Sequence, residues 1–197
     1  RGQEVAVWAV FDPGNYDNII EYTFRDDGSI GFRSGVSGFN NPSHQNVGHM
    51  HNTLWRLDMD LNGHANDSAF LARHVESGSL AEDDDEPFND GVEGFAWWNA
   101  LRFNALVVED AATNANGIGY ALQPLRTGTA RHLAPGEAWT HMDFGVTRFH
   151  QGEPSMAGND YQRPQTYLMQ GGSGASNGES IVNADLVLWH VSSAHHE

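Results

Sequence analysis

The chain has 197 residues, no cysteine and a formal net charge of −16, with a pI near 4.8. So acidic a chain repels phosphate backbones and anionic lipid surfaces, which excludes nucleic acids and membranes as expected partners, whereas metal ions and cationic substrates are attracted. The absence of cysteine excludes disulfides, thiolate metal sites and cysteine nucleophiles, and no stretch approaches the roughly 20 apolar residues of a membrane span.

Apolar and alternating segments recur between turn signals, which predicts strands. In chain order these segments are residues 4–11, 18–25, 29–36, 52–61, 100–109, 117–125, 143–150 and 180–191. DDGS at 26–29 predicts the tight turn of a hairpin. SAFLARHVESG fits either a short helix or a strand. Because no long 3.6-residue periodicity occurs, we expect one all-β domain over residues 1–197, folded as an antiparallel β-sandwich.

Three polar stretches are expected to be loops, namely residues 37–48, 79–94 and 169–180. The second carries an acidic run, which is most often a solvated face. The third contains GGSGAS but lacks the lysine and the strand–helix context of a phosphate loop.

The 11 histidines are numerous for this length. Isolated ones are more often structural than ligands; they include His44, His74, His132 and His150. In GHMHN, however, His49 and His51 stand at i and i+2, so on a strand both imidazoles project from one face and reach one metal ion. Neutral imidazole suits copper and zinc. The terminal SSAHHE offers a third ligand, and spacing does not choose between His195 and His196.

A pair of carboxylates follows in RLDMDLNG. Asp58 and Asp60 share a strand face with the Met59 carbonyl between them. Oxygen ligands so arranged suit Ca²⁺ or Mn²⁺. The alternative interpretation is that both aspartates are outward residues of an edge strand.

Together these features resemble the C-terminal catalytic domain of the copper-containing amine oxidases. In that family a tyrosine within Thr-x-x-Asn-Tyr-(Asp/Glu) becomes the quinone cofactor topaquinone, and GNYD supplies Asn15, Tyr16 and Asp17. The His-x-His copper pair of the family matches His49 and His51. Its third copper histidine follows Asp-x-Val-(Leu/Val)-Trp, and in ADLVLWHVSSAHH this position is His196.

The resemblance also implies a peripheral metal site and spans essentially the whole chain. Shorter matches are DDGSIGFRSGVSG, VTRFHQGE and ESIVNADLVLW. The peripheral ligands, for Ca²⁺ or Mn²⁺, would be Asp58, the Met59 carbonyl, Asp60, Asp185 and the Leu186 carbonyl.

The activity that the resemblance implies is copper-dependent oxidative deamination of primary amines by dioxygen, giving an aldehyde, ammonia and hydrogen peroxide. The cofactors would be Cu²⁺ and topaquinone derived from Tyr16, with Asn15 and Asp17 framing the quinone ring. The expected partners are a small primary amine and O₂, in a homodimer or with chains that supply missing segments. We expect an extracellular or periplasmic location.

The chain also departs from the family pattern. Asp12 occupies the position of the threonine, and Asn18 that of the usual aromatic residue. The family's catalytic base and gating tyrosine lie far upstream, so we expect either a piece of a longer oxidase or a minimal relative. Asp12, close to Tyr16 in sequence, is a candidate substitute base. The alternative functions are a non-catalytic copper-binding or structural protein with Tyr16 unmodified and, ranked last, a zinc hydrolase with three histidine ligands.

Overall fold

The computed structural model describes residues 2–12, 14–39, 48–77, 80–99, 103–110, 118–124, 138–150 and 178–196. The chain divides into two compact units. The first unit comprises Arg1–Thr53, Gly128–Arg131 and Ser192–Glu197, and the second comprises Leu54–Thr127 and His132–Val191. No helix in the described ranges has the length and apolarity needed to cross a membrane. The expectation of a single domain stays a prediction.

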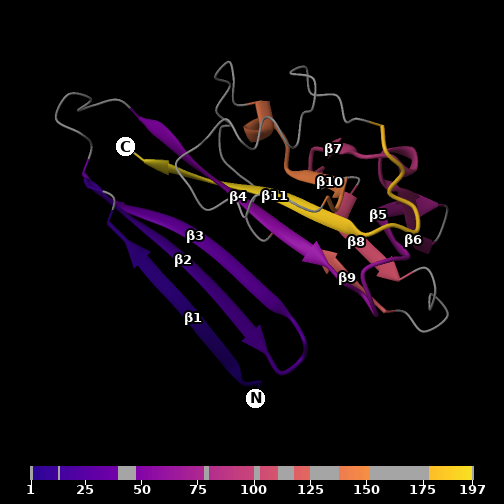
Figure 1. Ribbon diagram of the computed structural model, residues 1–197, viewed down its shortest axis with the longest axis horizontal. Coiled ribbons are helices and arrows are strands. Elements are labelled where there is room, and N and C mark those ends of the chain that lie inside the picture. Colours follow the sequence, from indigo (N-terminus) through magenta and orange to yellow (C-terminus); the bar gives the residue numbers. More distant parts are fainter. Residues whose placement is uncertain are drawn as a thin grey trace. The chain divides into compact units, whose positions relative to one another are not determined.

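The first unit contains a three-stranded antiparallel sheet. Its strands are β1 (Glu4–Phe11), β2 (Tyr16–Arg25) and β3 (Ile30–Gly38), in that order (Figure 1). The predicted DDGS hairpin turn joins β2 to β3, with the Gly28 N–H donating to the Arg25 carbonyl over 3.1 Å. The Ser29 hydroxyl and N–H both donate to the Asp27 carboxylate, which holds the pKa of that carboxyl below its usual value.

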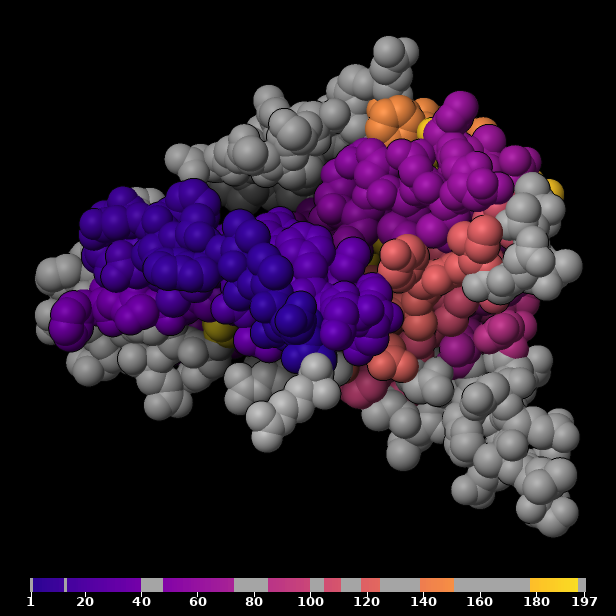
Figure 2. All heavy atoms as spheres, turned by 90° about the horizontal axis from the view of Figure 1, so that it is seen from below, coloured from indigo at the N-terminus to yellow at the C-terminus, as the bar shows by residue number. Residues whose placement is uncertain are grey.

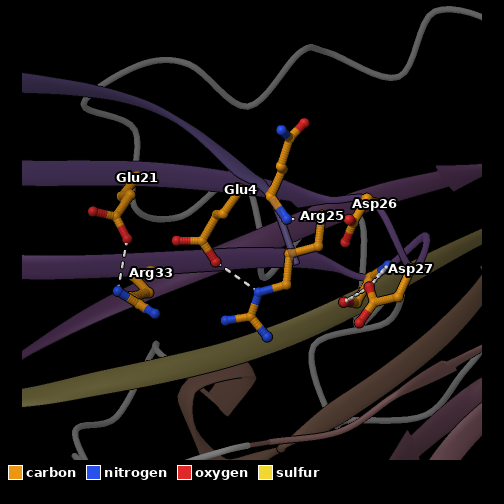
Figure 3. Close-up of polar contacts among 8 residues, drawn as sticks. Glu4, Glu21, Arg25, Asp26, Asp27 and Arg33 are labelled. Atoms are coloured by element: carbon orange, nitrogen blue, oxygen red, sulfur yellow. Dashed lines mark hydrogen bonds and ion pairs between the residues drawn. The ribbon is translucent and has the colours of Figure 1, made fainter. Parts of the chain in front are cut away.

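Both faces of this sheet carry exposed apolar side chains. One face holds Trp8, Val10 and Ile19 together with cross-strand ion pairs, Glu4 with Arg25 at 2.6 Å and Glu21 with Arg33 at 2.8 Å (Figure 3). The pairs are solvent-exposed, so each contributes at most about 1 kcal/mol. The register places exposed apolar side chains on the opposite face: Val5, Val7, Tyr22, Phe24 and Ile30. Figure 2 shows the atoms of β1–β3, indigo to violet, as a broad continuous surface.

Two long strands, β4 (His49–Met59) and β11 (Leu186–His196), are neighbours in a second sheet. They lie side by side and run in opposite directions (Figure 1). The start of β4 and the end of β11 belong to the first unit, where the Ser193 hydroxyl donates to the Asn52 side-chain oxygen over 2.6 Å. In the same unit the hydroxyl oxygens of Ser34 and Ser192 lie 3.0 Å apart, which links β3 to β11.

The second unit is built on two four-stranded sheets. The first has the order β4-β11-β10-β7, with β10 at Phe144–Arg148 and β7 at Gly94–Ala96. The second has the order β6-β5-β8-β9, with β6 at Leu80–Pro87, β5 at Asp67–Ser77, β8 at Phe103–Asp110 and β9 at Gly119–Leu122. Two 3₁₀ turns, η2 (Phe88–Gly91) and η4 (Ala138–His141), complete the described elements.

A core packs between these sheets, and β11 is buried on both of its faces. Its Leu186 and Leu188 join the core shared with β5, β8 and β10. The alternate residues Val187, Trp189 and Val191 pack on the other side of the sheet with Trp139 and Met142. Two-sided burial explains the continuous apolar run LVLW, and the all-β antiparallel sandwich is confirmed.

The prediction of a loop over 79–94 is wrong. Residues 80–87 form β6, which pairs along β5, and η2 and β7 follow. The acidic composition disfavours a strand locally, but backbone pairing with β5 overrides that preference, and charged residues suit an edge strand because they discourage further pairing. SAFLARHVESG lies in β5 and is a strand. Residues 40–47 and 169–177 of the other two expected loops lie outside the described residues, as do His44 and His132.

Candidate metal centre

Tyr16, His49 and His51 come together within the first unit. The Tyr16 hydroxyl oxygen lies 3.1 Å from Nε2 of His49, and the Nε2 atoms of His49 and His51 are 3.0 Å apart. The tyrosine ring meets both imidazoles edge-on, with centroid distances of 5.7 Å to His49 and 4.9 Å to His51. All three side chains are partly buried. The tyrosine and the histidine pair predicted from the sequence therefore form one cluster.

Strand geometry explains how these side chains meet. His49 and His51 alternate with Met50 at the start of β4, so both point to the same side. Tyr16 is the first residue of β2 and pairs with Gly38, the last residue of β3. Gly38 has φ +133°, and a Cβ there would overlap the Asn15 carbonyl oxygen and lie 3.0 Å from the Tyr16 Cα. Glycine at position 38 thus permits the close backbone approach that positions Tyr16.

The spacing of the two imidazoles fits a shared metal ion. With metal–nitrogen bonds of about 2.0–2.1 Å and angles between roughly 90° and 109°, two ligand nitrogens are about 2.9–3.3 Å apart. The observed 3.0 Å between the Nε2 atoms of His49 and His51 falls in that range. The Tyr16 hydroxyl oxygen, 3.1 Å from the His49 nitrogen, is equally close. The spacing of the two imidazole nitrogens therefore fits a shared metal ion, with the Tyr16 hydroxyl beside it.

The third expected ligand is placed by its backbone. Strand β11 ends at His196, beside β4, which begins at His49. Asn52 of β4 contacts Ser193 of β11, and the two strands run in opposite directions. Three residues back from Asn52 is His49, and three residues on from Ser193 is His196, so both lie toward the same end of the strand pair. The side chains of His195 and His196 lie outside the described residues, so His196 as the ligand stays a prediction.

The residues around Tyr16 are held by the β2–β3 end of the sheet. The Asn15 side-chain amide donates to the Phe39 carbonyl over 3.2 Å, and the Phe39 N–H donates to the Asn15 carbonyl over the same distance. Asp17 pairs with Ser37 and is exposed. Asp12 is exposed, and its Oδ1 accepts a hydrogen bond of 3.0 Å from the Gly14 N–H. Asn15 therefore anchors the turn before Tyr16.

A cavity of about 110 Å³ opens beside His51 in the first unit. No charged side chain is among its lining residues, which are Asn18, Ile19, Ile20, Ser34, Gly35, Val36, His51, Asn52, Thr53 and Ala194. Asn18, which stands where the family usually has an aromatic residue, thus lies at the wall of this space. The cavity has room for a small neutral molecule next to the histidine pair.

The carboxylates predicted as a peripheral site lie in the second unit. Asp58 pairs with Arg56 at 3.0 Å. Burial, followed by the charges of Asp58 and Asp60, raises the pKa of Asp185 above its usual value, so the three carboxylates are electrostatic neighbours. Their ligand atoms are not gathered into a compact group, because the one described trio of acidic or histidine side chains with ligand atoms all within 4.8 Å lies elsewhere.

That compact trio consists of Glu93, His150 and Glu179. His150 Nε2 lies 2.9 Å from Glu179 Oε2, and buried Glu93 accepts a hydrogen bond of 2.8 Å from the Arg148 N–H. In the sequence His150 stands as an isolated histidine. Residues 93, 150 and 179 are far apart along the chain, so no local sequence pattern groups them. They meet because the Glu93 N–H donates to the Glu179 carbonyl over 2.9 Å.

Comparison with protein-family models identifies the family of the chain. The model described as copper amine oxidase, enzyme domain, matches residues 1–197. The chain belongs to the copper amine oxidase family. A search of curated proteins found no match.

Solved amine oxidases share the fold of this copper amine oxidase domain. The amine oxidase of Aspergillus nidulans is 23% identical over 99% of this chain and 31% of its own, with a TM-score of 0.72. The copper-containing benzylamine oxidase of Hansenula polymorpha is 18% identical over 100% of this chain and 36% of its own, with a TM-score of 0.67. The lysyl oxidase of Pichia pastoris is 17% identical over 98% of this chain and 31% of its own, with a TM-score of 0.65. The chain thus spans about a third of the length of these relatives.

Proposed function

We propose that this copper amine oxidase domain holds copper through His49, His51 and His196 and carries a quinone made from Tyr16, with which the whole protein oxidises primary amines to aldehyde, ammonia and hydrogen peroxide. The observation that supports the proposal is the position of the Tyr16 hydroxyl oxygen, 3.1 Å from a histidine nitrogen that is itself 3.0 Å from the second histidine. A tyrosine that only packed in the sheet would have no need of an imidazole nitrogen at its hydroxyl.

When bound, copper would supply one-electron chemistry with dioxygen, and the quinone would supply the electron sink for amine oxidation. The chain's own residues would position the reacting ring. Pairing of Tyr16 with Gly38 fixes the backbone, and the Asn15 side chain ties the preceding residue to Phe39. The charge-free cavity beside His51 is suited to dioxygen or hydrogen peroxide rather than to an ammonium group, since no lining carboxylate would neutralise a cation.

The general base is a separate part of the proposal. Asp12 lies four residues before Tyr16 in the sequence, and its Oδ1 accepts a hydrogen bond from the Gly14 N–H. If Asp12 removes the α-proton of the amine, Asp12→Asn forms the quinone normally but does not turn over amines. Normal turnover by this variant would assign the base to another segment of the protein.

We also propose substrates, an assembly, a location and a second metal ion for the protein. Small primary amines and dioxygen are the substrates, the assembly is a homodimer or a complex with chains that complete the site, and the protein works outside the cytoplasm. A Ca²⁺ or Mn²⁺ ion at Asp58, Asp60, Asp185 and the carbonyls of Met59 and Leu186 would offset the burial and the mutual repulsion that together raise the pKa of Asp185.

The test is aerobic copper loading of the metal-free protein, followed by quinone staining and mass spectrometry of the Tyr16 peptide. We expect added oxygen on Tyr16 with copper and none with zinc. Tyr16→Phe abolishes the stain, whereas Tyr22→Phe, which removes an exposed hydroxyl from the same strand, leaves it intact. Tight copper binding without any mass change would instead support the non-catalytic copper-binding alternative.

A further inference from the structure

Two side-chain hydrogen bonds join strands of the first unit beside the candidate metal centre. The Ser193 hydroxyl of β11 donates to the side-chain oxygen of Asn52 on β4 over 2.6 Å. The hydroxyl oxygens of Ser34 on β3 and Ser192 on β11 lie 3.0 Å apart. All four residues belong to the first unit and are half-buried. Strand β11 therefore uses two successive serines to contact two different strands.

Backbone pairing does not fix the distance between Tyr16 and the histidine pair. Tyr16 lies in the sheet β1-β2-β3, whereas His49 and His51 lie on β4, in the sheet that β4 forms with β11. The cavity of about 110 Å³ is lined by residues of all four strands β2, β3, β4 and β11. Because an open space lacks the close packing that holds side chains in a core, polar contacts beside it are needed to maintain the separation.

The contact between Asn52 and Ser193 lies directly next to the histidine pair. Asn52 follows His51 on β4, and side chains alternate between the faces of a strand, so the Asn52 side chain is turned away from the face of the imidazoles. It is therefore not a further ligand of an ion held by His49 and His51. Its oxygen instead ties the histidine-bearing end of β4 to β11, the strand that ends at His196.

The contact between Ser34 and Ser192 links the tyrosine-bearing sheet to the same strand. Ser34 is paired with Ile20 in the β2–β3 register, and Ile20 lies four residues after Tyr16 on β2. Residues an even number of positions apart project from the same side of a strand, so Tyr16 and Ser34 share one face of the sheet. A hydrogen bond from that face to β11 consequently limits how far the tyrosine moves from the histidines.

We propose that these two pairs are positioning residues of the metal centre: Asn52 with Ser193 holds the histidine pair against β11, and Ser34 with Ser192 holds Tyr16 near it. Groups that orient a metal ligand without touching the metal typically change the metal affinity 10- to 100-fold when they are removed. A hydrogen bond between partly buried neutral groups contributes only modestly to stability, so the loss of either pair leaves the fold intact. The inference rests on the copper site of the proposed function.

The test compares two serine-to-alanine variants of the full chain in two assays. In the first assay, the metal-free protein competes for Cu²⁺ with a chromogenic chelator in the absence of oxygen. We expect Ser193→Ala to weaken Cu²⁺ binding about tenfold. In the second assay, aerobic loading with saturating Cu²⁺ is followed by mass spectrometry of the Tyr16 peptide. We expect Ser34→Ala to slow the addition of oxygen to Tyr16 about tenfold and to leave the Cu²⁺ affinity near that of wild type, since its contact reaches the tyrosine-bearing sheet and not β4.

Two further variants separate positioning from a loss of stability. Ser193→Thr keeps a hydroxyl on β11 and restores the Cu²⁺ affinity. Ser37→Ala, at an exposed position of β3, behaves as wild type in both assays. Electron paramagnetic resonance of bound Cu²⁺ adds a readout of ligand geometry. We expect the spectrum of Ser193→Ala to differ from that of wild type, although the thermal unfolding of the metal-free protein is nearly unchanged.

Each result supports or overturns a stated part of the proposal. If wild type binds Cu²⁺ and gains oxygen on Tyr16, but Ser193→Ala and Ser34→Ala match it in both assays, the positioning role is wrong and the proposed function stands. If Ser193→Ala only lowers the unfolding temperature of the metal-free protein, with an unchanged Cu²⁺ spectrum and affinity, Ser193 is merely structural. Failure of wild type itself to bind Cu²⁺ would overturn the proposed function, and the positioning role with it.

Discussion

At the scale of single residues, the histidine pair was predictable and the approach of Tyr16 was not. His49 and His51 share a face because side chains alternate on any strand, and that rule needs only the sequence. Tyr16 lies 33 positions before His49, and its hydroxyl reaches the His49 imidazole across elements distant in sequence, since β3 contacts β11 through Ser34 and Ser192 and β11 neighbours β4. Local patterns carry no information on such contacts. The resemblance of GNYD to a family motif supplied that link instead.

The burial of Asp67 likewise has no signal in the sequence. In NGHANDSAF this residue follows glycine and asparagine residues of the kind that are common in turns. The structure buries it completely because β5 starts at this residue, where it pairs with Asp110 and its N–H donates to the Ala184 carbonyl over 3.0 Å. Burial of a charged residue at a strand start depends on neighbours that are distant in sequence.

The buried carboxylate of Asp67 makes stability depend on pH. Its pKa is about 6 in the folded chain, against an ordinary value of 3.8. Between pH 4 and pH 6 the folded state therefore binds more protons than the unfolded state, and the free energy of unfolding falls as the pH rises. Over this pH range the free energy of unfolding falls by about 3 kcal/mol in total, because the pKa of Asp67 differs by roughly two between the folded and unfolded chain.

We expect Asp67→Asn to remove this decline. Chemical denaturation with chelator present, at several pH values from 4 to 7, would show the variant gaining stability over wild type as the pH rises. Asp85→Asn serves as the control, because it removes one exposed carboxylate from β6 and leaves Asp67 in place. Parallel profiles for wild type and Asp67→Asn would mean that Asp67 does not titrate in this window.

At the scale of elements, strand positions followed from alternation, whereas the acidic strand β6 did not. The first three strands begin and end within two residues of the predicted segments. LAEDDDEP has no apolar alternation, and its extended conformation comes from pairing with β5 along eight register positions. An edge strand needs no buried face, so the hydrophobic pattern that reveals inner strands is absent.

The end of β3 provides a sharp test of how an element positions the site. Gly38→Ala places a Cβ against the Asn15 carbonyl at a φ of +133°, which side chains rarely adopt. We expect a loss of about 1–3 kcal/mol in stability and reduced copper-dependent modification of Tyr16, since the backbone beside Tyr16 must shift. Ser37→Ala, at the neighbouring exposed position on the same strand, should be nearly neutral in both assays. Equal losses in the two variants would show that Gly38 has no special role.

At the scale of the whole molecule, charge is the property that composition predicts best. The chain carries 26 acidic residues against 10 arginines and no lysine. The sequence therefore predicted an acidic protein that attracts cations, and the buried aspartates of the second unit concentrate that charge. Composition could not predict where the charge gathers, because the location depends on which strands pair. Solubility alone would not require carboxylates at zero exposure.

This excess of negative charge should make stability depend on salt. With a net charge of −16, self-repulsion destabilises the compact state, and raising NaCl from 0.01 M to 0.5 M shortens the screening length from about 30 Å to a few ångströms. We expect the thermal midpoint, measured with chelator present at pH 7.5, to rise by roughly 2–8 °C. For a chain of this length that rise corresponds to a gain of about 1–2 kcal/mol in the free energy of unfolding. The internal control is the same titration near pH 5, close to the pI of about 4.8, where little net charge is left to screen and the midpoint should hardly move. Equal salt shifts at the two pH values would show that salt acts through the hydrophobic effect and not through the net charge.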